Sequence, residues 1–311
     1  MKAYTDPRDA TFAELFEIAC SNPDVILLTA DTGAFIFKDF QKEIPDQFYN
    51  VGIAEQNAMS VAAGLALTGK SVFVFGISSF VTYRCYEQIK IDIVSMHLPV
   101  TILGMGTGYG YASDGPTHHV TQDISIMRSL PGMTIWSPSD CTMTAAAVHL
   151  AYESRSPNYI RIDKGPFIPL YSPEKFDFSP GLAEVLPGKD LAILATAPMV
   201  TQALKAVELL KQKNIQAGVV DVYRLKPANE KLITEIIQKY PAVVTLEEHT
   251  LPGGFGGMIA EIICDHGICK PMLRLGIPDT TRLELGSREF VREIEHLHLN
   301  GVVDSIVDWK K

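Results

Sequence analysis

The sequence predicts an α/β protein built from two doubly wound domains, each with a mainly parallel sheet. A chain of 311 residues is too long for one ordinary hydrophobic core, so two domains are expected. Short apolar runs rich in β-formers alternate with helical patterns along the chain. These runs are apolar throughout, which is typical of parallel strands covered by helices on both faces.

The first domain, residues 1–165, contains five candidate strands. In chain order they are VILLTA, SVFVFGI, PVTILGM, MTIWS and YIRI. Helical patterns lie between them at Glu55–Thr68, Phe80–Ser95 and Cys141–Glu153. The first of these helices carries small and apolar residues on most faces, so we expect it to be buried.

A linker and a second, smaller domain follow. Residues 166–189 are rich in proline and polar residues and lack helical periodicity, which predicts a linker. Over residues 190–311 the alternation resumes with the candidate strands LAILATA, QAGVVDV, AVVTLEE and PMLRLGI. Helices are expected between these strands, so this part is a second α/β domain.

Composition excludes several classes of protein. With 47% hydrophobic and 20% charged residues the chain is an ordinary globular protein, and no apolar run reaches the roughly 18–20 residues of a membrane helix. The N-terminal residues lack an apolar signal core, so we expect a cytoplasmic protein. A net charge of -9 without a basic cluster argues against nucleic-acid binding. The five cysteines form no CxxC pair and are expected to be reduced.

Glu55 raises a specific question, because a carboxylate at the first turn of an apolar helix is rarely buried unless it is paired or used. It either complements the positive end of the helix dipole or is held in a site. The loop from Gly104 to Asp123 adds Asp114 and the adjacent His118 and His119, which suit proton transfer or binding of a polyhydroxy substrate. The alternative is a glycine-rich turn whose histidines cap neighbouring backbone.

Two further stretches carry candidate binding residues. Phe80 and Tyr83 follow the second strand and can stack on a flat heterocycle, although by residue type alone core packing is the simpler interpretation. Arg161 and Lys164 lie at the end of the last strand, where they either bind a phosphate or carboxylate or form a solvated strand end. The histidine pair has no further ligand at metal-binding spacing, so we expect no metal site.

Taken together and in this order, the motifs GIAEQN, SSFVTYRCYEQI, SDGPTHH, WSPSD, GGFGG and LGIPD resemble the C-terminal half of the transketolase family of thiamine diphosphate enzymes. The resemblance covers essentially the whole chain. It implies a pyrimidine-binding domain, a linker and a transketolase C-terminal domain. It also implies ketol transfer, in which a two-carbon unit passes from a ketose to an aldose acceptor.

The resemblance gives roles to individual residues. Glu55 would hydrogen-bond the aminopyrimidine of the cofactor and activate it, with Phe80, Tyr83 and Ile53 as further cofactor contacts. Asp114 and His118 would contact substrate hydroxyls, and His118 would also move protons. Lys164 and Arg161 would bind the substrate's terminal group. Since many relatives carry arginine where Lys164 stands, and lysine cannot bind bidentately, a weaker phosphate grip is expected.

The sequence departs from the family in one respect that implies a partner. The GDG motif and distant asparagine that hold the diphosphate and its metal in these enzymes do not occur in this chain. We therefore expect a separate subunit of the N-terminal type to carry that motif, to bind Mg²⁺ (or Ca²⁺), and to form an α2β2 heterotetramer with this chain.

Three other functions stay open on the sequence. The beta subunits of 2-oxo acid dehydrogenases have a similar layout but lack the DGPTH pattern. The 1-deoxyxylulose 5-phosphate synthases condense pyruvate with an aldehyde phosphate, share the AEQ context and the histidine segment, and carry their own GDG half. A non-catalytic regulatory subunit of the same fold is the third. The SDGPTHH stretch favours ketol transfer.

Overall fold

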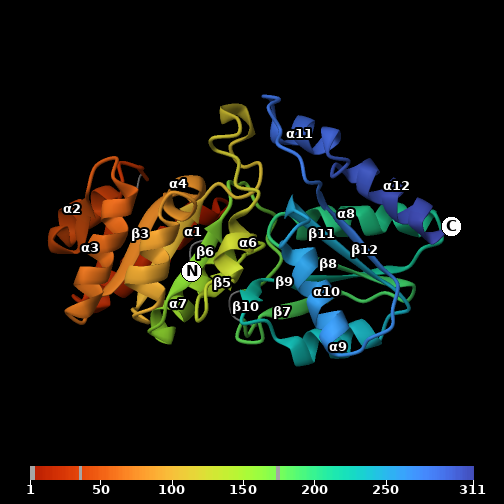
Figure 1. Ribbon diagram of the computed structural model, residues 1–311, viewed down its shortest axis with the longest axis horizontal. Coiled ribbons are helices and arrows are strands. Elements are labelled where there is room, and N and C mark those ends of the chain that lie inside the picture. The colour runs from red at the N-terminus through yellow and green to blue at the C-terminus, as the bar shows by residue number, and fades with distance from the viewer. Residues whose placement is uncertain (1–3, 35–36, 173–175) are drawn as a thin grey trace. The chain divides into compact units, whose positions relative to one another are not determined.

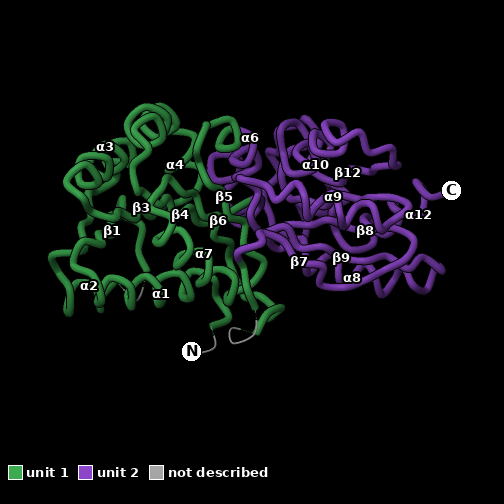
Figure 2. Tube along the Cα trace, turned by 90° about the horizontal axis from the view of Figure 1, so that it is seen from below, with its two compact units in different colours: residues 1–107, 126–178 green, residues 108–125, 179–311 purple. Residues whose placement is uncertain are grey.

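The computed structural model describes residues 4–34, 37–172 and 176–311, and the chain divides into two compact units. Unit 1 comprises residues 1–107 and 126–178, and unit 2 comprises residues 108–125 and 179–311 (Figures 1 and 2). The predicted class of two α/β domains with mainly parallel sheets is confirmed. The histidine loop, however, clusters with unit 2 rather than with the strands that flank it in sequence.

Unit 1 is a parallel sheet between two layers of helices. Its strands lie in the order β5-β6-β4-β3-β1-β2, and every neighbouring pair is parallel. Figure 2 shows α3 and α4 on one side of this sheet and α1, α2 and α7 on the other. The strand bounds are β1 Val25–Thr29, β2 Phe48–Asn50, β3 Ser71–Ile77, β4 Val100–Met105, β5 Thr134–Trp136 and β6 Asn158–Ile162.

Two helices of unit 1, α1 and α7, begin at side-chain caps. Asp6 caps α1 by accepting a hydrogen bond from Arg8 N at 2.9 Å, and Asp140 caps α7 by accepting one from Met143 N at 2.7 Å. The bounds are α1 Pro7–Ser21, α2 Phe37–Glu43, η1 Pro45–Gln47, α3 Glu55–Leu67, α4 Ser78–Thr82, α5 Tyr86–Gln88, η2 Ile89–Val94 and α7 Cys141–Ser154. Helix α6, Asp123–Arg128, spans the boundary between the units.

Unit 2 has a five-stranded sheet in the order β12-β11-β8-β9-β7. The first four strands are mutually parallel, and the edge strand β7 is antiparallel to β9. The bounds of these five strands are β7 Leu182–Leu186, β8 Leu191–Ala195, β9 Ala217–Val222, β11 Val243–Thr250 and β12 Met272–Ile277. The short strand β10, Arg224–Lys226, follows β9 in the chain and is not part of this sheet. The helices are η3 Ala112–Asp114, α8 Met199–Gln212, α9 Glu230–Gln238, α10 Phe255–Asp265, α11 Arg288–Ile294 and α12 Leu299–Lys310.

Two local expectations differ from the structure. The helix expected over Phe80–Ser95 is divided into α4, α5 and η2, and the last of these has the wider π-helical pattern, with Ser95 N donating to Lys90 O. The predicted linker 166–189 contains strand β7, in which the segment LAEVL pairs with β9. Because this segment is short and lies next to prolines, its sequence pattern did not predict a strand. Residues 173–175 of that linker lie outside the described residues.

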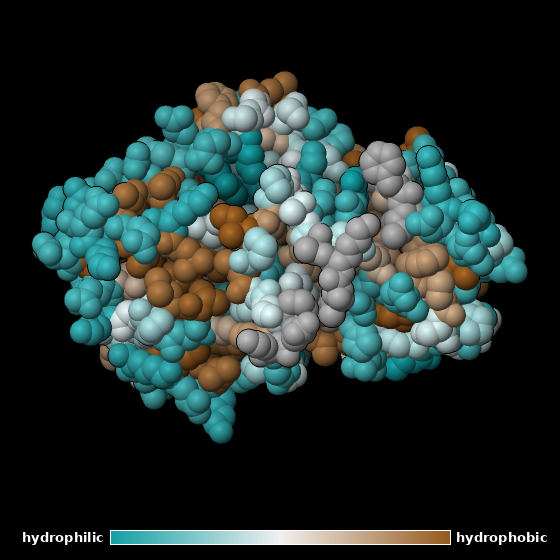
Figure 3. Space-filling model, turned by 180° about the vertical axis from the view of Figure 1, so that it is seen from behind, coloured by the Kyte–Doolittle hydropathy of each residue, from teal (hydrophilic) through white to brown (hydrophobic). Residues whose placement is uncertain are grey.

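The prediction that helix α3 is buried is wrong for one of its faces. Ala58, Met59 and Ala62 pack inward, whereas Val61 and Leu67 are exposed by 37% and 61%. Small and apolar composition gave no sign of this division, since both faces have it. On the face seen in Figure 3, apolar areas also lie among hydrophilic ones, so an exposed apolar residue needs its position as a further argument before it indicates an interface.

Candidate active site

In unit 1, three side chains from two segments meet at the start of α3. Glu55 is the first residue of that helix, and its side chain is buried. Arg84 donates from Nη1 to Glu55 Oε2 at 2.7 Å. The same guanidinium lies over the ring of Phe80, with Cζ 4.6 Å from the ring centroid. The carboxyl end of β3 leads directly into α4, and this turn brings Phe80 and Arg84 beside α3.

The geometry of this cluster matters more than its contribution to stability. Arg84 is nearly half exposed, so its ion pair with Glu55 contributes at most about 1 kcal/mol. A carboxylate in the first helical turn is also favoured by the helix dipole. What the cluster provides is a buried acceptor beside an aromatic face. A planar group that donates a hydrogen bond to Glu55 while covering Phe80 fits this position, as the Arg84 guanidinium demonstrates.

The sequence did not indicate the role of Arg84. The available signal was its spacing from Phe80, because residues four apart on a helical segment lie on one face. Ile53 lies two residues before Glu55 and is 78% exposed, and Tyr83 follows α4 as a partly exposed C-cap residue. Their contacts with a cofactor stay predictions.

In unit 2, a short backbone pairing closes the loop that carries the histidines. Gly108 and Val120 exchange two backbone hydrogen bonds of 3.0 and 2.8 Å, which close the loop at its base. Asp114 ends the helical turn η3 and is exposed near the tip of the loop. Gly115 follows with φ of 77°, a left-handed conformation that favours glycine.

The structure separates the two adjacent histidines. His118 is partly exposed, and its Nδ1 lies 2.9 Å from Thr117 Oγ1. His119 is buried, and its ring makes an edge-to-face contact with Tyr109 at a centroid distance of 5.0 Å. Burial lowers the pKa of His119, and its contact with the Ala112 carbonyl only partly opposes this effect. His118 is therefore the more exposed of the two, and His119 packs inside the loop.

The two basic candidates of unit 1 lie in different environments at the end of β6. Arg161 is only 3% exposed and donates from Nη1 to Ser137 Oγ at 2.8 Å. Lys164 is exposed, and its backbone N–H donates to Asp163 Oδ1 at 2.6 Å. Their proposed roles in substrate binding stay predictions, with Lys164 the more accessible of the two.

The glycine-rich turn before α10 binds a carboxylate of the chain itself. Glu247 is fully buried and accepts hydrogen bonds from Phe255 N at 2.6 Å and Gly256 N at 2.7 Å. A helix N-terminus is a natural anion site, and this one holds Glu247. The GGFGG stretch is accordingly a tight turn around an acidic side chain rather than a nucleotide-binding loop.

Membrane-spanning helices and metal clusters are both absent from the described residues. None of their helices has the length and apolar character needed to cross a membrane. Within the same parts of the chain, no group of three or more His, Cys, Asp or Glu side chains is arranged to hold a metal ion.

Comparison with known proteins shows which family the chain belongs to. The transketolase pyrimidine-binding domain matches residues 5–167, and the transketolase C-terminal domain matches residues 181–295. The chain therefore belongs to the transketolase family, which confirms the resemblance found in the sequence.

Individual relatives narrow the comparison. One of the subunits of the apulose-4-phosphate transketolase of Phocaeicola vulgatus is 36% identical over 290 residues, covering 93% of this chain and 90% of the relative. A solved split gene transketolase, described as an inactive beta4 tetramer, is 33% identical with a TM-score of 0.87 and covers 98% of both chains. The 1-deoxy-D-xylulose-5-phosphate synthase of Aquifex aeolicus is 34% identical over 87% of this chain but only 43% of its own length.

Proposed function

We propose that this chain is the cofactor-activating subunit of a two-chain, thiamine-diphosphate-dependent transketolase. The enzyme would transfer a two-carbon ketol unit from a ketose or ketose phosphate to an aldose acceptor. The observation that carries the proposal is the buried Glu55 at the start of α3, hydrogen-bonded to a planar nitrogen donor that covers Phe80. Two proteins of similar length support it: a relative named as a transketolase subunit and a solved structure named as a split gene transketolase.

The residues of unit 1 fit the aminopyrimidine end of the cofactor. Like the Arg84 guanidinium, an aminopyrimidine is flat and presents nitrogen atoms at its edge, so Glu55 and Phe80 offer it the same two contacts. Glu55 holds a proton at the ring nitrogen, Phe80 covers the ring face, and Tyr83 and Ile53 enclose it. The bound cofactor supplies the electron sink for carbon–carbon bond cleavage and formation.

The substrate is assigned to other residues. Asp114 and His118 bind hydroxyl groups of the sugar, and His118 takes up and returns a hydroxyl proton, since imidazole titrates near neutrality. Lys164, with Arg161, is assigned to the terminal group of the substrate. Lysine offers a point charge rather than a bidentate fork, so a phosphate would be held less tightly than by arginine.

The exposed face of α3 supports a partner subunit. Ile53, Val61 and Leu67 expose apolar side chains on the helix that begins at Glu55 or directly before it. We assign this face to a subunit of the N-terminal type that carries the GDG motif and asparagine, because its diphosphate and metal ligands must lie close to the ring that Glu55 holds. That subunit would bind Mg²⁺ (or Ca²⁺), and the assembly would be an α2β2 heterotetramer.

The test is reconstitution with such a partner and exchange of one oxygen in Glu55. Glu55→Gln should lower ketol transfer by at least about 100-fold, because the amide cannot share its proton with the ring nitrogen in the same way. Size-exclusion chromatography should show unchanged assembly. Glu17→Gln, on an exposed position of α1, is the matched control and should keep full activity. Unchanged turnover in Glu55→Gln would refute the mechanism, and an inactive wild-type complex that binds no thiamine diphosphate would favour a non-catalytic subunit.

One observation favours a second candidate. The similarity to 1-deoxy-D-xylulose-5-phosphate synthase extends over 87% of this chain, so a synthase-type reaction of pyruvate with an aldehyde phosphate is the alternative. Offering the reconstituted complex pyruvate or a ketose as donor, with the same acceptor, separates the two reactions. Product formed only from pyruvate would replace ketol transfer with the synthase reaction.

A further inference from the structure

In unit 2, the last two residues of strand β11, His249 and Thr250, bind the C-terminal end of the loop that carries His118 and His119. Thr250 donates from its backbone N and from Oγ1 to Thr121 O, at 2.8 and 3.0 Å. His249 is 1% exposed, and its Nε2 accepts a hydrogen bond of 3.1 Å from Ile124 N. These contacts fix the stretch that follows the histidines to a buried strand of unit 2.

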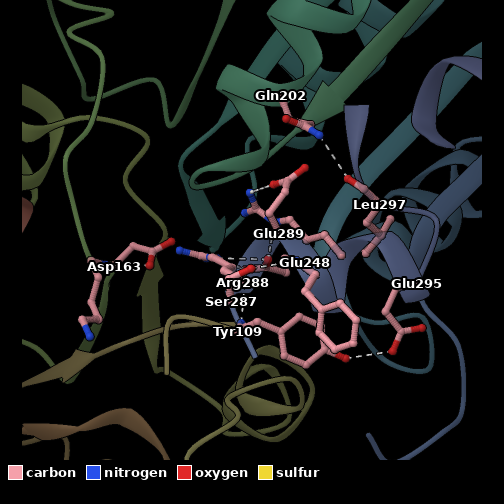
Figure 4. A network of polar contacts seen from close by, with 12 residues as sticks. Tyr109, Asp163, Gln202, Glu248, Ser287, Arg288, Glu289, Glu295 and Leu297 are labelled. Atoms are coloured by element: carbon pink, nitrogen blue, oxygen red, sulfur yellow. Dashed lines mark hydrogen bonds and ion pairs between the residues drawn. The ribbon is translucent and has the colours of Figure 1, made fainter. Parts of the chain in front are cut away.

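The preceding residue of β11 holds the near end of the loop. Glu248 is buried, and its Oε2 accepts a hydrogen bond of 3.2 Å from Tyr109 N. Arg288 and Arg292 of α11 both donate to the same carboxylate, Arg292 Nε at 2.6 Å (Figure 4). Burial alone would raise the pKa of Glu248, but the two guanidinium groups outweigh burial and lower the pKa to about 2.

The side chain of Tyr109 extends the same network. Its hydroxyl donates to Glu295 Oε1 at 2.9 Å (Figure 4). Arg282 donates to both oxygens of that carboxylate, at 2.5 and 3.0 Å. The ring of Tyr109 also makes an edge-to-face contact with the ring of His119. Gly115, next to Asp114, packs so closely under Leu285 that an added Cβ would lie 2.8 Å from Leu285 Cδ2.

We propose that these contacts make Tyr109, Glu248 and Glu295 positioning residues, through which unit 2 holds the loop in the conformation that presents Asp114 and His118 to the substrate. The proposal rests on the assignment of these two residues to sugar binding. Buried ion pairs add little net stability, whereas they can define a single conformation. A loop ordered in advance spares the substrate the entropy of ordering it.

The test compares two tyrosines of unit 2. Tyr109→Phe removes a hydroxyl bonded to Glu295 in the loop network, and Tyr240→Phe removes the hydroxyl of another buried tyrosine, which donates to Glu184 at 2.5 Å outside that network. In the complete complex, Tyr109→Phe should raise KM for the ketose about tenfold, the effect of one lost hydrogen bond. Its kcat and its affinity for thiamine diphosphate should stay close to those of wild type, and Tyr240→Phe should leave all three unchanged.

Hydrogen exchange provides a readout that does not need activity. Backbone amides of residues 110–119 should exchange faster in Tyr109→Phe than in Tyr240→Phe. If Tyr109→Phe folds poorly, Arg282→Met at a partly exposed position serves as a second variant. Its loop amides should also exchange faster than those of wild type, but by a smaller factor than in Tyr109→Phe. Equal exchange of the loop in all variants would overturn the proposal. A wild-type complex without ketol transfer would refute the proposed function instead, while the exchange comparison would still decide whether the loop is positioned in this way.

Discussion

His118 and His119 differ in environment although they are neighbours in the chain. The backbone turn that starts at Gly115 sends His118 toward solvent beside Thr117 and His119 inward against Tyr109. One imidazole, that of His118, is therefore partly exposed, and the other, that of His119, packs inside the loop. Residue type alone gives no means of choosing between them.

Exchanging each histidine for asparagine should separate the two roles. His118→Asn should lower kcat/KM by about 10²- to 10⁴-fold, the usual contribution of a general acid–base group, with little change in unfolding free energy. His119→Asn should instead cost about 1–3 kcal/mol of unfolding free energy, because a buried polar group loses its fit. Steady-state kinetics and urea denaturation measure the two effects. The reverse pattern would contradict the assignment of His118.

The stability of the folded chain should also depend on pH through His119. Because the pKa of His119 is lowered in the folded state by burial, the unfolded chain binds its proton more readily. The contribution of His119 to the free energy of unfolding is therefore fully present above the unfolded pKa of about 6.5. It declines as the pH falls below that value toward the folded pKa. His119→Asn should flatten this decline, measured by thermal unfolding as the pH falls below about 6.5.

At the scale of single elements, helix α3 combines a packed face with an exposed apolar one. Its alanines cover strand β3, and Ser60 donates to Asp92 Oδ2 at 2.8 Å across to η2. In the isolated chain Val61 and Leu67 are exposed to water, so they add little hydrophobic burial to its stability. Both side chains would stabilise an assembly in which another surface covers them.

Leu67→Glu should therefore weaken association with the partner subunit. A carboxylate in an apolar interface costs about 1–3 kcal/mol, so the dissociation constant should rise about 5- to 150-fold. The chain by itself should keep its melting temperature, since Leu67 is exposed. Ile168→Glu, at another exposed apolar position of unit 1 outside α3, is the control. Analytical ultracentrifugation that finds equal affinity for both variants would remove α3 from the interface.

Element boundaries show where local pattern stops being informative. The apolar strands were predictable, because complete burial leaves a continuous hydrophobic run. Division of the helix expected over Phe80–Ser95 was not, since it depends on which backbone carbonyls each turn selects. Strand β7 escaped notice because an edge strand needs only one partner and only one apolar face.

At the scale of the whole molecule, cofactor retention should depend on the second chain. Thiamine diphosphate with Mg²⁺ should bind this chain alone at least about 100-fold more weakly than the complex, because two lost charge-assisted hydrogen bonds to the diphosphate already cost about 3–6 kcal/mol. Equilibrium dialysis measures both affinities. Thiamine itself lacks the diphosphate and should gain little from the partner. Equal affinity of this chain and the complex for thiamine diphosphate would contradict a split site.

The candidate site was predictable from sequence to the extent that its residues lie in short ordered motifs. Glu55, Phe80, Asp114 and His118 stand in such motifs, and the family they indicate is confirmed. Arg84 was not predictable as a partner of Glu55, because the two are 29 positions apart and meet only through the turn after β3.

Local sequence patterns were enough to establish the alternation of strands and helices, the two-domain class and the family, because each depends on periodicity or on motifs within a few residues. Long-range packing established which face of α3 is exposed, which histidine is accessible, and that residues 108–125 cluster with unit 2. The contacts responsible for the last point join Tyr109 to Glu248 and Glu295, which are 139 and 186 positions away. Pairing over such distances follows from the fold of the chain and leaves no pattern in any local window of sequence.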